Sequence, residues 1–218
     1  MNFYLITEFA SASVFLAAII AFFKFKNAAS SFLPFFIFIW VGAANEIVTY
    51  FTIHYLRSNM VNNNIYVLAE SLLLLWLFYC WQLFNTSKWL MWALGASFIL
   101  FWVGEVFVFS EITRVAGYFR IFYSFPIVLL SISMINRLLT QERGNLLKNA
   151  AFIICVAFVV YFTFKILIEI FYIYGMMRSK DFRIGVFDIM RVINLICNLI
   201  YAVALIWIPR KNSSLMPS

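Results

Sequence analysis

Residues 149–174 read NAAFIICVAFVVYFTFKILIEIFYIY, an apolar run with two charged residues, Lys165 and Glu169. Such a run is long enough to cross a lipid bilayer as a helix, which needs about 20 mostly apolar residues. The whole chain has the same character: of its 218 residues 65% are hydrophobic and 11% are charged, and its mean hydropathy is +0.96. Globular domains have about 45–50% apolar and about 25% charged residues. The composition therefore indicates an integral membrane protein.

Seven apolar runs of this kind follow one another along the chain. They predict an all-α, polytopic membrane protein in which residues 1–218 form a single seven-helix bundle. The connectors are too short for a soluble domain, which usually has at least about 50 residues. We expect spans over residues 4–23, 32–54, 65–85, 89–109, 117–135, 149–174 and 184–208, with Asn62, Asn63 and Asn64 opening the third.

Seven spans place the two ends of the chain on opposite sides of the membrane, and basic residues favour the cytoplasmic side. With the N-terminus outside, eight Lys and Arg residues face the cytoplasm and six face the exterior. The cytoplasmic set is Lys24, Lys26, Lys88, Arg137, Arg143, Lys148, Arg210 and Lys211. We therefore expect a multi-pass protein of the inner cell membrane with a cytoplasmic C-terminus.

Ionisable residues inside a membrane span are costly, at roughly 2.5–3.5 kcal/mol each, so each one indicates a partner, a water-filled cavity or a function. Measured from the middle of each span, Glu46, Glu70, Lys165 and Arg191 all fall in the outer half. Polar residues three or four positions away share their helix faces. We predict a polar cavity between the second, third, sixth and seventh spans. Its candidate ligand-binding residues are Asn45, Glu46, Glu70, Lys165, Glu169, Asp188, Arg191 and Asn194.

Some of these residues also have a purely structural interpretation. Lys165 with Glu169, and Asp188 with Arg191, stand at helical spacing and could form neutralising pairs that hold helices in register. Asn194 and Asn198 are better explained as interhelical hydrogen-bonding groups than as ligand contacts.

Glu46 and Glu70 are harder to explain by structure alone. Neither has a basic residue at helical spacing on its own span. We expect at least one of them to be protonated, unless Lys165 or Arg191 pairs with it directly.

Several site types are disfavoured by the residues themselves. The chain has one histidine, His54, which excludes a metal site built from two or three imidazoles. Its three cysteines lie in apolar runs without metal-ligand spacing and are expected to be core residues. The net charge of +7 is explained by membrane topology rather than by nucleic-acid binding. We expect no metal, no cofactor and no nucleic-acid partner.

A set of short phrases distributed over nearly the whole chain resembles an uncharacterised group of short bacterial seven-helix membrane proteins. The phrases are Ile39-Trp40 with Asn45-Glu46, Ala69 to Leu73, Arg120 to Ser124, Ile193-Asn194, Asn198 to Tyr201, and Trp207 to Pro209. This resemblance implies a lineage and a helix count, and it implies no activity.

Three functions remain open at this point. The first is a non-enzymatic, receptor-like or sensor-like bundle that binds a small polar or cationic ligand, with a cytoplasmic signalling partner near Arg137 to Lys148. The second is a small-solute or proton-coupled transporter that uses Glu46 and Glu70. The third is a membrane-embedded enzyme acting on lipid through paired carboxylates. No catalytic motif is present, so we expect a protein that is not an enzyme.

Overall fold

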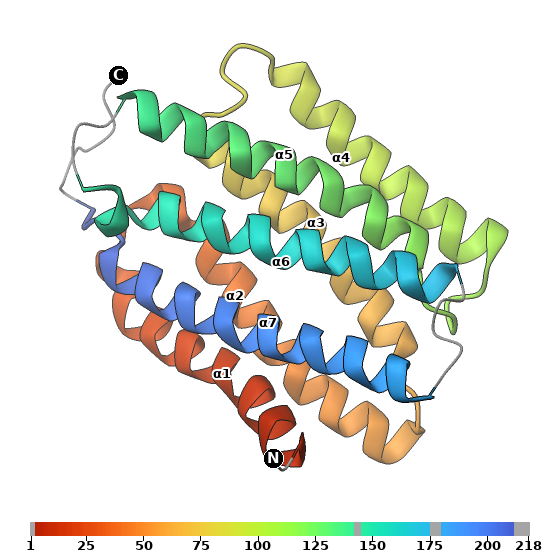
Figure 1. The fold of residues 1–218 in the computed structure, drawn as a ribbon. Coiled ribbons are helices and arrows are strands. Elements are labelled where there is room, and N and C mark those ends of the chain that lie inside the picture. The colour runs from red at the N-terminus through yellow and green to blue at the C-terminus, as the bar shows by residue number, and fades with distance from the viewer. Residues whose placement is uncertain (1–2, 142–144, 175–179, 212–218) are drawn as a thin grey trace.

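The computed structural model describes residues 3–141, 145–174 and 180–211, which form seven α-helices (Figure 1). The helices are α1 (Phe3–Lys24), α2 (Leu33–Phe51), α3 (Met60–Cys80), α4 (Lys88–Val103), α5 (Gly117–Gln141), α6 (Ala150–Ile173) and α7 (Lys180–Trp207). Within these ranges there is no strand, and one isolated bridge pairs Ala28 with Arg210. The all-α prediction is confirmed.

Six helical stretches in the described ranges are long and apolar enough to cross a membrane. They are Ser30–Leu56, Met60–Cys80, Lys88–Phe109, Gly117–Thr140, Ala150–Ile173 and Ile184–Trp207. A protein with multiple membrane spans is thus supported. The seventh span, which would correspond to α1, and the orientation of the termini stay predictions.

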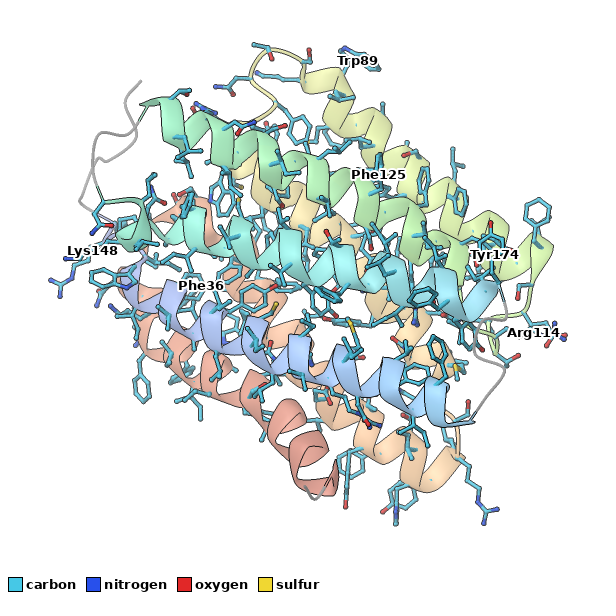
Figure 2. The ribbon with its side chains drawn as sticks, in the orientation of Figure 1. Phe36, Trp89, Arg114, Phe125, Lys148 and Tyr174 are labelled. Carbon is cyan, nitrogen blue, oxygen red and sulfur yellow. The ribbon has the colours of Figure 1, made fainter. Side chains whose placement is uncertain are left out.

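The helices form a ring in which each packs against its neighbours in sequence. Helix α1 packs against α2 and also against α7, while α6 lies between α5 and α7. Helix α3 contacts α5 directly, so α4 lies outside the ring against these two helices, at one edge of the bundle in Figure 1. Large apolar side chains such as Trp89 and Phe125 project outward, as expected of a surface that faces lipid (Figure 2).

The two ends of the bundle differ. Helices α2 and α4 are each prolonged by a π-helical turn, η3 (Thr52–Leu56) and η4 (Gly104–Phe109). We call the end that carries η3, η4 and the connector 110–116 the η end. The opposite end is formed by residues 24–32, 81–88, 137–141, 145–149 and 208–211. We call it the basic end because its ionisable residues, where the structure describes them, are all Lys or Arg.

The third helix begins earlier than the sequence predicts. We expected Asn62 to Asn64 to open a span at residue 65, but α3 begins at Met60 and ends at Cys80. The asparagine amides do not cap the helix. Asn62 instead donates to Asn45 Oδ1 on α2 at 2.9 Å, and Asn64 is buried against the connector 110–116. Polar residues that bond to other segments are compatible with the body of a helix.

Aromatic side chains fill the centre of the bundle on the side of the basic end. Five buried rings from α2, α3, α6 and α7 pack with centroid separations of 5.7–6.4 Å: Phe35, Phe38, Phe78, Phe158 and Tyr201. Most of the contacts are edge-on, a favourable arrangement for aromatic pairs. This aromatic cluster leaves the η half as the place where polar groups gather.

Candidate functional site

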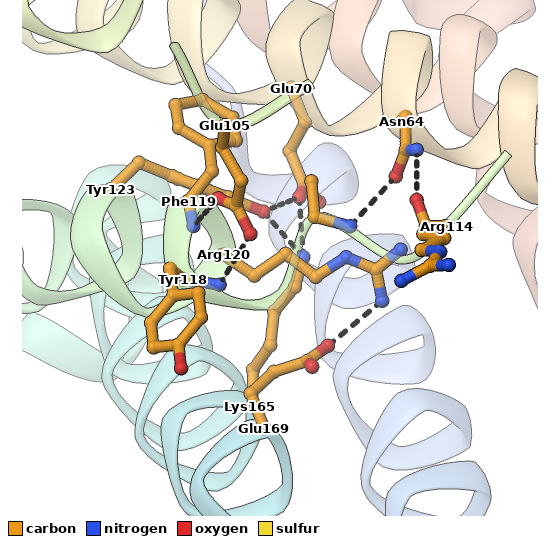
Figure 3. A network of polar contacts seen from close by, with 11 residues as sticks. Asn64, Glu70, Glu105, Arg114, Tyr118, Phe119, Arg120, Tyr123, Lys165 and Glu169 are labelled. Carbon is orange, nitrogen blue, oxygen red and sulfur yellow. Dashed lines mark hydrogen bonds and ion pairs between the residues drawn. The ribbon is translucent and has the colours of Figure 1, made fainter. Parts of the chain in front are cut away.

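Glu70 on α3 is the centre of a buried polar cluster (Figure 3). It is 1% exposed and accepts hydrogen bonds from three side chains. Lys165 Nζ on α6 lies 2.6 Å from its Oε2, the Tyr123 hydroxyl on α5 donates to the same oxygen, and the Tyr66 hydroxyl lies 3.4 Å from Oε1. Three helices of the ring therefore meet at one carboxylate.

Lys165 is held by more than its ion pair. Its ammonium also donates to the Tyr123 hydroxyl at 2.5 Å, and it lies 5.1–5.4 Å from the ring centroids of Tyr123, Tyr161 and Phe162. Cations at this distance from aromatic faces are attracted by the ring quadrupole. The Lys165 charge is thus stabilised although it is buried among apolar helices.

A second ion pair lies beside the first. Arg120 Nη1 on α5 donates to Glu169 Oε1 on α6 at 2.8 Å. The Nε and Nη2 atoms of Arg120 are buried and have no hydrogen-bond partner among the described residues. Arg120 and Tyr123 lie one turn apart on α5, as do Lys165 and Glu169 on α6. The Glu70–Lys165 pair therefore joins α6 to α3, and the Arg120–Glu169 pair joins α6 to α5 one turn further along α6.

The pairing differs from the one that the sequence suggests. Spacing offers Lys165 and Glu169 as partners within one helix, but each binds a residue of another helix. Likewise Glu70 has a basic partner, from α6, which no spacing along its own helix could reveal. The sequence predicts that Glu46 or Glu70 is protonated unless Lys165 or Arg191 pairs with it directly. Lys165 does pair with Glu70, so this exception applies to Glu70.

Glu105 positions the helix that carries Arg120 and Tyr123. Its buried carboxylate, on η4, accepts the backbone N–H groups of Tyr118 at 3.0 Å and Phe119 at 2.5 Å (Figure 3). These amides belong to the first turn of α5, whose N–H groups have no partner within the helix. A carboxylate at a helix N-terminus also interacts favourably with the helix dipole. Glu105 is therefore a structural residue of the site.

Asn64 fixes the connector between α4 and α5. Its amide nitrogen donates to the carbonyls of Ile112 at 2.9 Å and Arg114 at 2.6 Å, and its amide oxygen accepts from the N–H of Ala116 at 3.2 Å. The Trp102 indole N–H donates to the Asn64 carbonyl at 2.8 Å. One buried side chain thus satisfies three groups of a connector that lacks regular structure.

A cavity of about 310 Å³ opens beside the two ion pairs, bordered by α1, α2, α3, α5, α6 and α7. Phe38 and Tyr201 of the aromatic cluster line it on the side of the basic end. Polar groups make up most of the remaining lining: Asn45, Glu46, Thr49, Asn59, Asn63, Tyr66, Glu70, Arg120, Tyr161, Lys165, Glu169, Asn194 and Asn198. The cavity is polar toward the η end and aromatic at its floor.

The structure brings six of the eight predicted site residues to this cavity: Asn45, Glu46, Glu70, Lys165, Glu169 and Asn194. Asp188 and Arg191 are not among its lining residues. They pair with each other at 2.6 Å, and the Arg191 side chain is 44% exposed. The prediction that Arg191 shares the cavity with the acids is wrong.

A local ion pair accounts for that difference. The α7 residues that line the cavity are Phe187, Met190, Asn194, Asn198 and Tyr201. Arg191 stands at helical spacing from Phe187 and Asn194, but its guanidinium binds Asp188 of the preceding turn and its side chain is 44% exposed. Asn198, on the lining face, donates to Ser13 of α1 at 2.9 Å, which is an interhelical bond of the expected kind.

Sequence reasoning missed Tyr123 as a member of the site. Its spacing of three residues from Arg120 would have placed both on one face of α5, and a tyrosine within an apolar span needs a partner for its hydroxyl. Tyr66 stands four residues before Glu70 on the same face of α3, which agrees with the 3.4 Å contact between its hydroxyl and Glu70 Oε1.

No group of three or more His, Cys, Asp and Glu side chains is placed to hold a metal ion in the part of the chain that the structure describes. The lining side chains of the cavity can form ion pairs and can donate and accept hydrogen bonds. No protein-family model, no curated protein and no solved structure matches this chain.

Proposed function

We propose that this protein is a receptor-like membrane protein that binds a small polar ligand in the cavity between α2, α3, α6 and α7. One observation carries the proposal: a polar cavity of about 310 Å³ in the η half is backed by a packed aromatic floor. Pockets of small-molecule sites measure about 300–1,000 Å³, so this cavity suits a small ligand. The floor supports binding from one side of the membrane rather than passage through the bundle.

The lining favours a neutral or cationic ligand over an anion. Three carboxylates and two cations line the cavity, so acidic groups are in excess. Both cations are already paired with carboxylates, Lys165 with Glu70 and Arg120 with Glu169. Asparagine amides and tyrosine hydroxyls supply donors and acceptors for a ligand rich in hydroxyl or amino groups.

Orientation decides from which side the ligand arrives. With the N-terminus outside, the η end faces the exterior and the basic end faces the cytoplasm, in agreement with the positive-inside tendency. A ligand in the cavity would then be captured from outside the cell. A cytoplasmic partner near Arg137 to Lys148 would receive the signal.

The ion pairs offer a route for that signal. A ligand that contacts Tyr66 or Glu70 changes the environment of a carboxylate shared by α3, α5 and α6. Helix α5 continues to the basic end, where Arg137 Nη1 donates to the Gln82 carbonyl at 2.9 Å. A shift of α5 against α3 would therefore also change the position of Arg137 and the surface around it.

A proton-coupled transporter is the second candidate, and the Glu70–Lys165 pair is the observation that favours it. Ionisable residues inside membrane spans are a common feature of proton relays. Transport additionally requires the aromatic cluster to open toward the basic end.

The experiment is a thermal-stability screen of the purified protein with sorbitol, choline, putrescine and glutamate as probes. We expect stabilisation by at least one of the first three, since a ligand that binds only the folded state stabilises it. Glutamate, with its net negative charge, should have no effect. Stabilisation by none of the three would contradict the proposal.

Two variants test whether the stabilising compound binds in the cavity. Asn194→Leu removes a polar group of the lining and should abolish the stabilisation, whereas Asn136→Leu makes the same change on the exposed surface of α5 and should preserve it. Uptake of the stabilising compound into proteoliposomes would show transport and would favour the transporter over the receptor-like function.

A further inference from the structure

The positive charge of the protein is concentrated at one end of the bundle. Among the residues that the structure describes, those at the basic end include seven Lys and Arg side chains and no Asp or Glu. They are Lys24, Lys26, Lys88, Arg137, Lys148, Arg210 and Lys211. A cluster of this sign beside membrane-spanning helices is attracted to a membrane leaflet that contains anionic lipids.

A second cavity, of about 210 Å³, lies within this basic end between the last turn of α1 and the segment after α7. Phe23, Lys24, Asn27, Ala28, Ile208 and Arg210 line it. Backbone bonds hold its two walls together: the Ala29 N–H donates to the Pro209 carbonyl at 3.0 Å, and the Lys211 N–H to the Asn27 carbonyl at 2.8 Å. The cavity is thus a defined feature of the fold rather than a gap between side chains.

Two basic side chains border this cavity. Lys24 Nζ donates to the carbonyl of Ile206, in the last turn of α7, at 3.1 Å. An ammonium group has three donors, so this bond leaves Lys24 able to bind an anion as well. Bases near helix C-termini also compensate the helix dipole, which is the competing explanation for Lys24. Dipole compensation does not require a cavity with a second base, Arg210, on its wall.

Exposed apolar side chains lead from the membrane region to the cavity. On α1 the side chains of Leu16, Ile19 and Phe23 are exposed, and on the adjacent α7 those of Val203 and Ile206 are exposed. In a bilayer these side chains contact acyl chains. A ligand with an anionic headgroup and acyl chains would therefore match both the cavity and the faces below it.

We propose that the cavity between α1 and the end of α7 binds the phosphate of an anionic phospholipid, through Lys24 and Arg210. This site is separate from the polar cavity in the η half and does not depend on its function. Inorganic phosphate shares the charged group but cannot contact the apolar faces, so a phospholipid is the expected ligand.

The test is a titration of the detergent-solubilised protein with dioleoylphosphatidylglycerol, with lipid binding followed by native mass spectrometry. We expect tighter binding than for dioleoylphosphatidylcholine, which has no net charge. The double variant Lys24→Gln/Arg210→Gln should weaken phosphatidylglycerol binding about 25-fold. This value follows because one basic residue at an anionic surface contributes about 1 kcal/mol, or about fivefold in affinity.

The control is Lys26→Gln/Lys88→Gln, which removes the same charge from the same end without touching the cavity lining. Its affinity should change less than the affinity of the cavity variant. Equal weakening by both double variants would show that only the general surface charge matters, and would overturn the site. Competition by millimolar inorganic phosphate would overturn the assignment to a phospholipid.

Single variants keep the test decisive if the cavity double variant does not fold. Arg210→Gln should then weaken binding about fivefold. Lys24→Arg, which keeps the charge and donors to the Ile206 carbonyl, should leave it unchanged. An unchanged affinity in Arg210→Gln would contradict the proposal.

Discussion

At the scale of single residues, the Glu70 carboxylate is the group on which the site depends. It accepts hydrogen bonds from Lys165, Tyr123 and Tyr66, and it is almost wholly buried. A buried ion pair does not necessarily stabilise a protein, because desolvation opposes the attraction. Removing one partner is nevertheless strongly destabilising, because the remaining charge is left buried without compensation.

We predict that Glu70→Gln lowers the free energy of unfolding by about 3–5 kcal/mol, since it strands the Lys165 ammonium in the bundle. Denaturant or thermal unfolding in detergent measures the change. The matched control is Asp188→Asn, which breaks the exposed pair with Arg191 and should cost about 0–1 kcal/mol. Similar losses in both variants would show that the Glu70 pair is not the buried ion pair described here.

The double variant Glu70→Leu/Lys165→Leu separates the charge from the packing. A buried pair replaced by apolar residues often leaves stability unchanged or raises it. We therefore predict that the double variant is more stable than Glu70→Gln in the same unfolding measurement. A double variant less stable than Glu70→Gln would mean that losing the acceptor for the Tyr123 and Tyr66 hydroxyls costs more than leaving the Lys165 ammonium without a carboxylate partner.

At the scale of helices and connectors, the η end is held together by side chains that bond to backbone. Glu105 binds the first turn of α5, and Asn64 binds the connector that precedes it. Both residues lie on other elements, η4 and α3. The start of α5, and with it Arg120, is therefore positioned by groups from its neighbours.

We predict that Glu105→Ala speeds hydrogen exchange of the Tyr118 and Phe119 amides. Loss of a helix cap typically costs about 1 kcal/mol, which corresponds to a roughly fivefold faster local opening. Exchange measured by mass spectrometry on peptides covering 117–121 would report it. Glu111→Ala, in the exposed part of the same connector, should leave these amides unchanged.

The sequence predicts the helices well and their contacts poorly. Apolar runs such as 149–174 are set by the length of a bilayer, which is why α6 covers Ala150–Ile173 as expected. The start of α3 was misplaced because Asn62 and Asn64 bond to other segments rather than cap their own helix. Such contacts depend on how helices are rotated and packed, and spacing along one helix does not contain that information.

The same limit applies to the site. Depth in the membrane follows from position along a span, and it grouped Glu46, Glu70 and Lys165 correctly around one cavity. Partner choice does not follow from depth, so the Glu70–Lys165 and Arg120–Glu169 pairs became visible only with the helices assembled. Arg191 shares helical spacing with the lining residues Phe187 and Asn194, and only the assembled structure shows that its guanidinium binds Asp188 instead of entering the cavity.

At the scale of the whole molecule, the polar η half and the basic end lie at opposite ends of one helical bundle. The orientation prediction places the η end outside the cell. A cysteine introduced at Ser58 should react with a membrane-impermeant maleimide added to intact cells, and one introduced at Asn27 should not. The unsubstituted protein, with Cys80, Cys155 and Cys197, gives the background. The reverse labelling pattern would invert the orientation and leave the fold as described.

Filling the cavity in the η half with a larger side chain tests directly whether a ligand binds there. Gly42 on α2 lines the cavity, and a Cβ atom there would lie 3.7 Å from the Tyr66 hydroxyl and from Val14 Cγ2, an ordinary contact. Gly42→Ala should therefore be tolerated, whereas Gly42→Leu extends into the cavity.

The measurement is the thermal stabilisation that a binding compound from the screen produces in these two variants and in Gly95→Leu, a control on α4. We predict full stabilisation in Gly42→Ala and Gly95→Leu, and none in Gly42→Leu, which should unfold at nearly the same temperature as the parent protein without ligand. Undiminished stabilisation of a folded Gly42→Leu variant would place the ligand elsewhere and contradict the account.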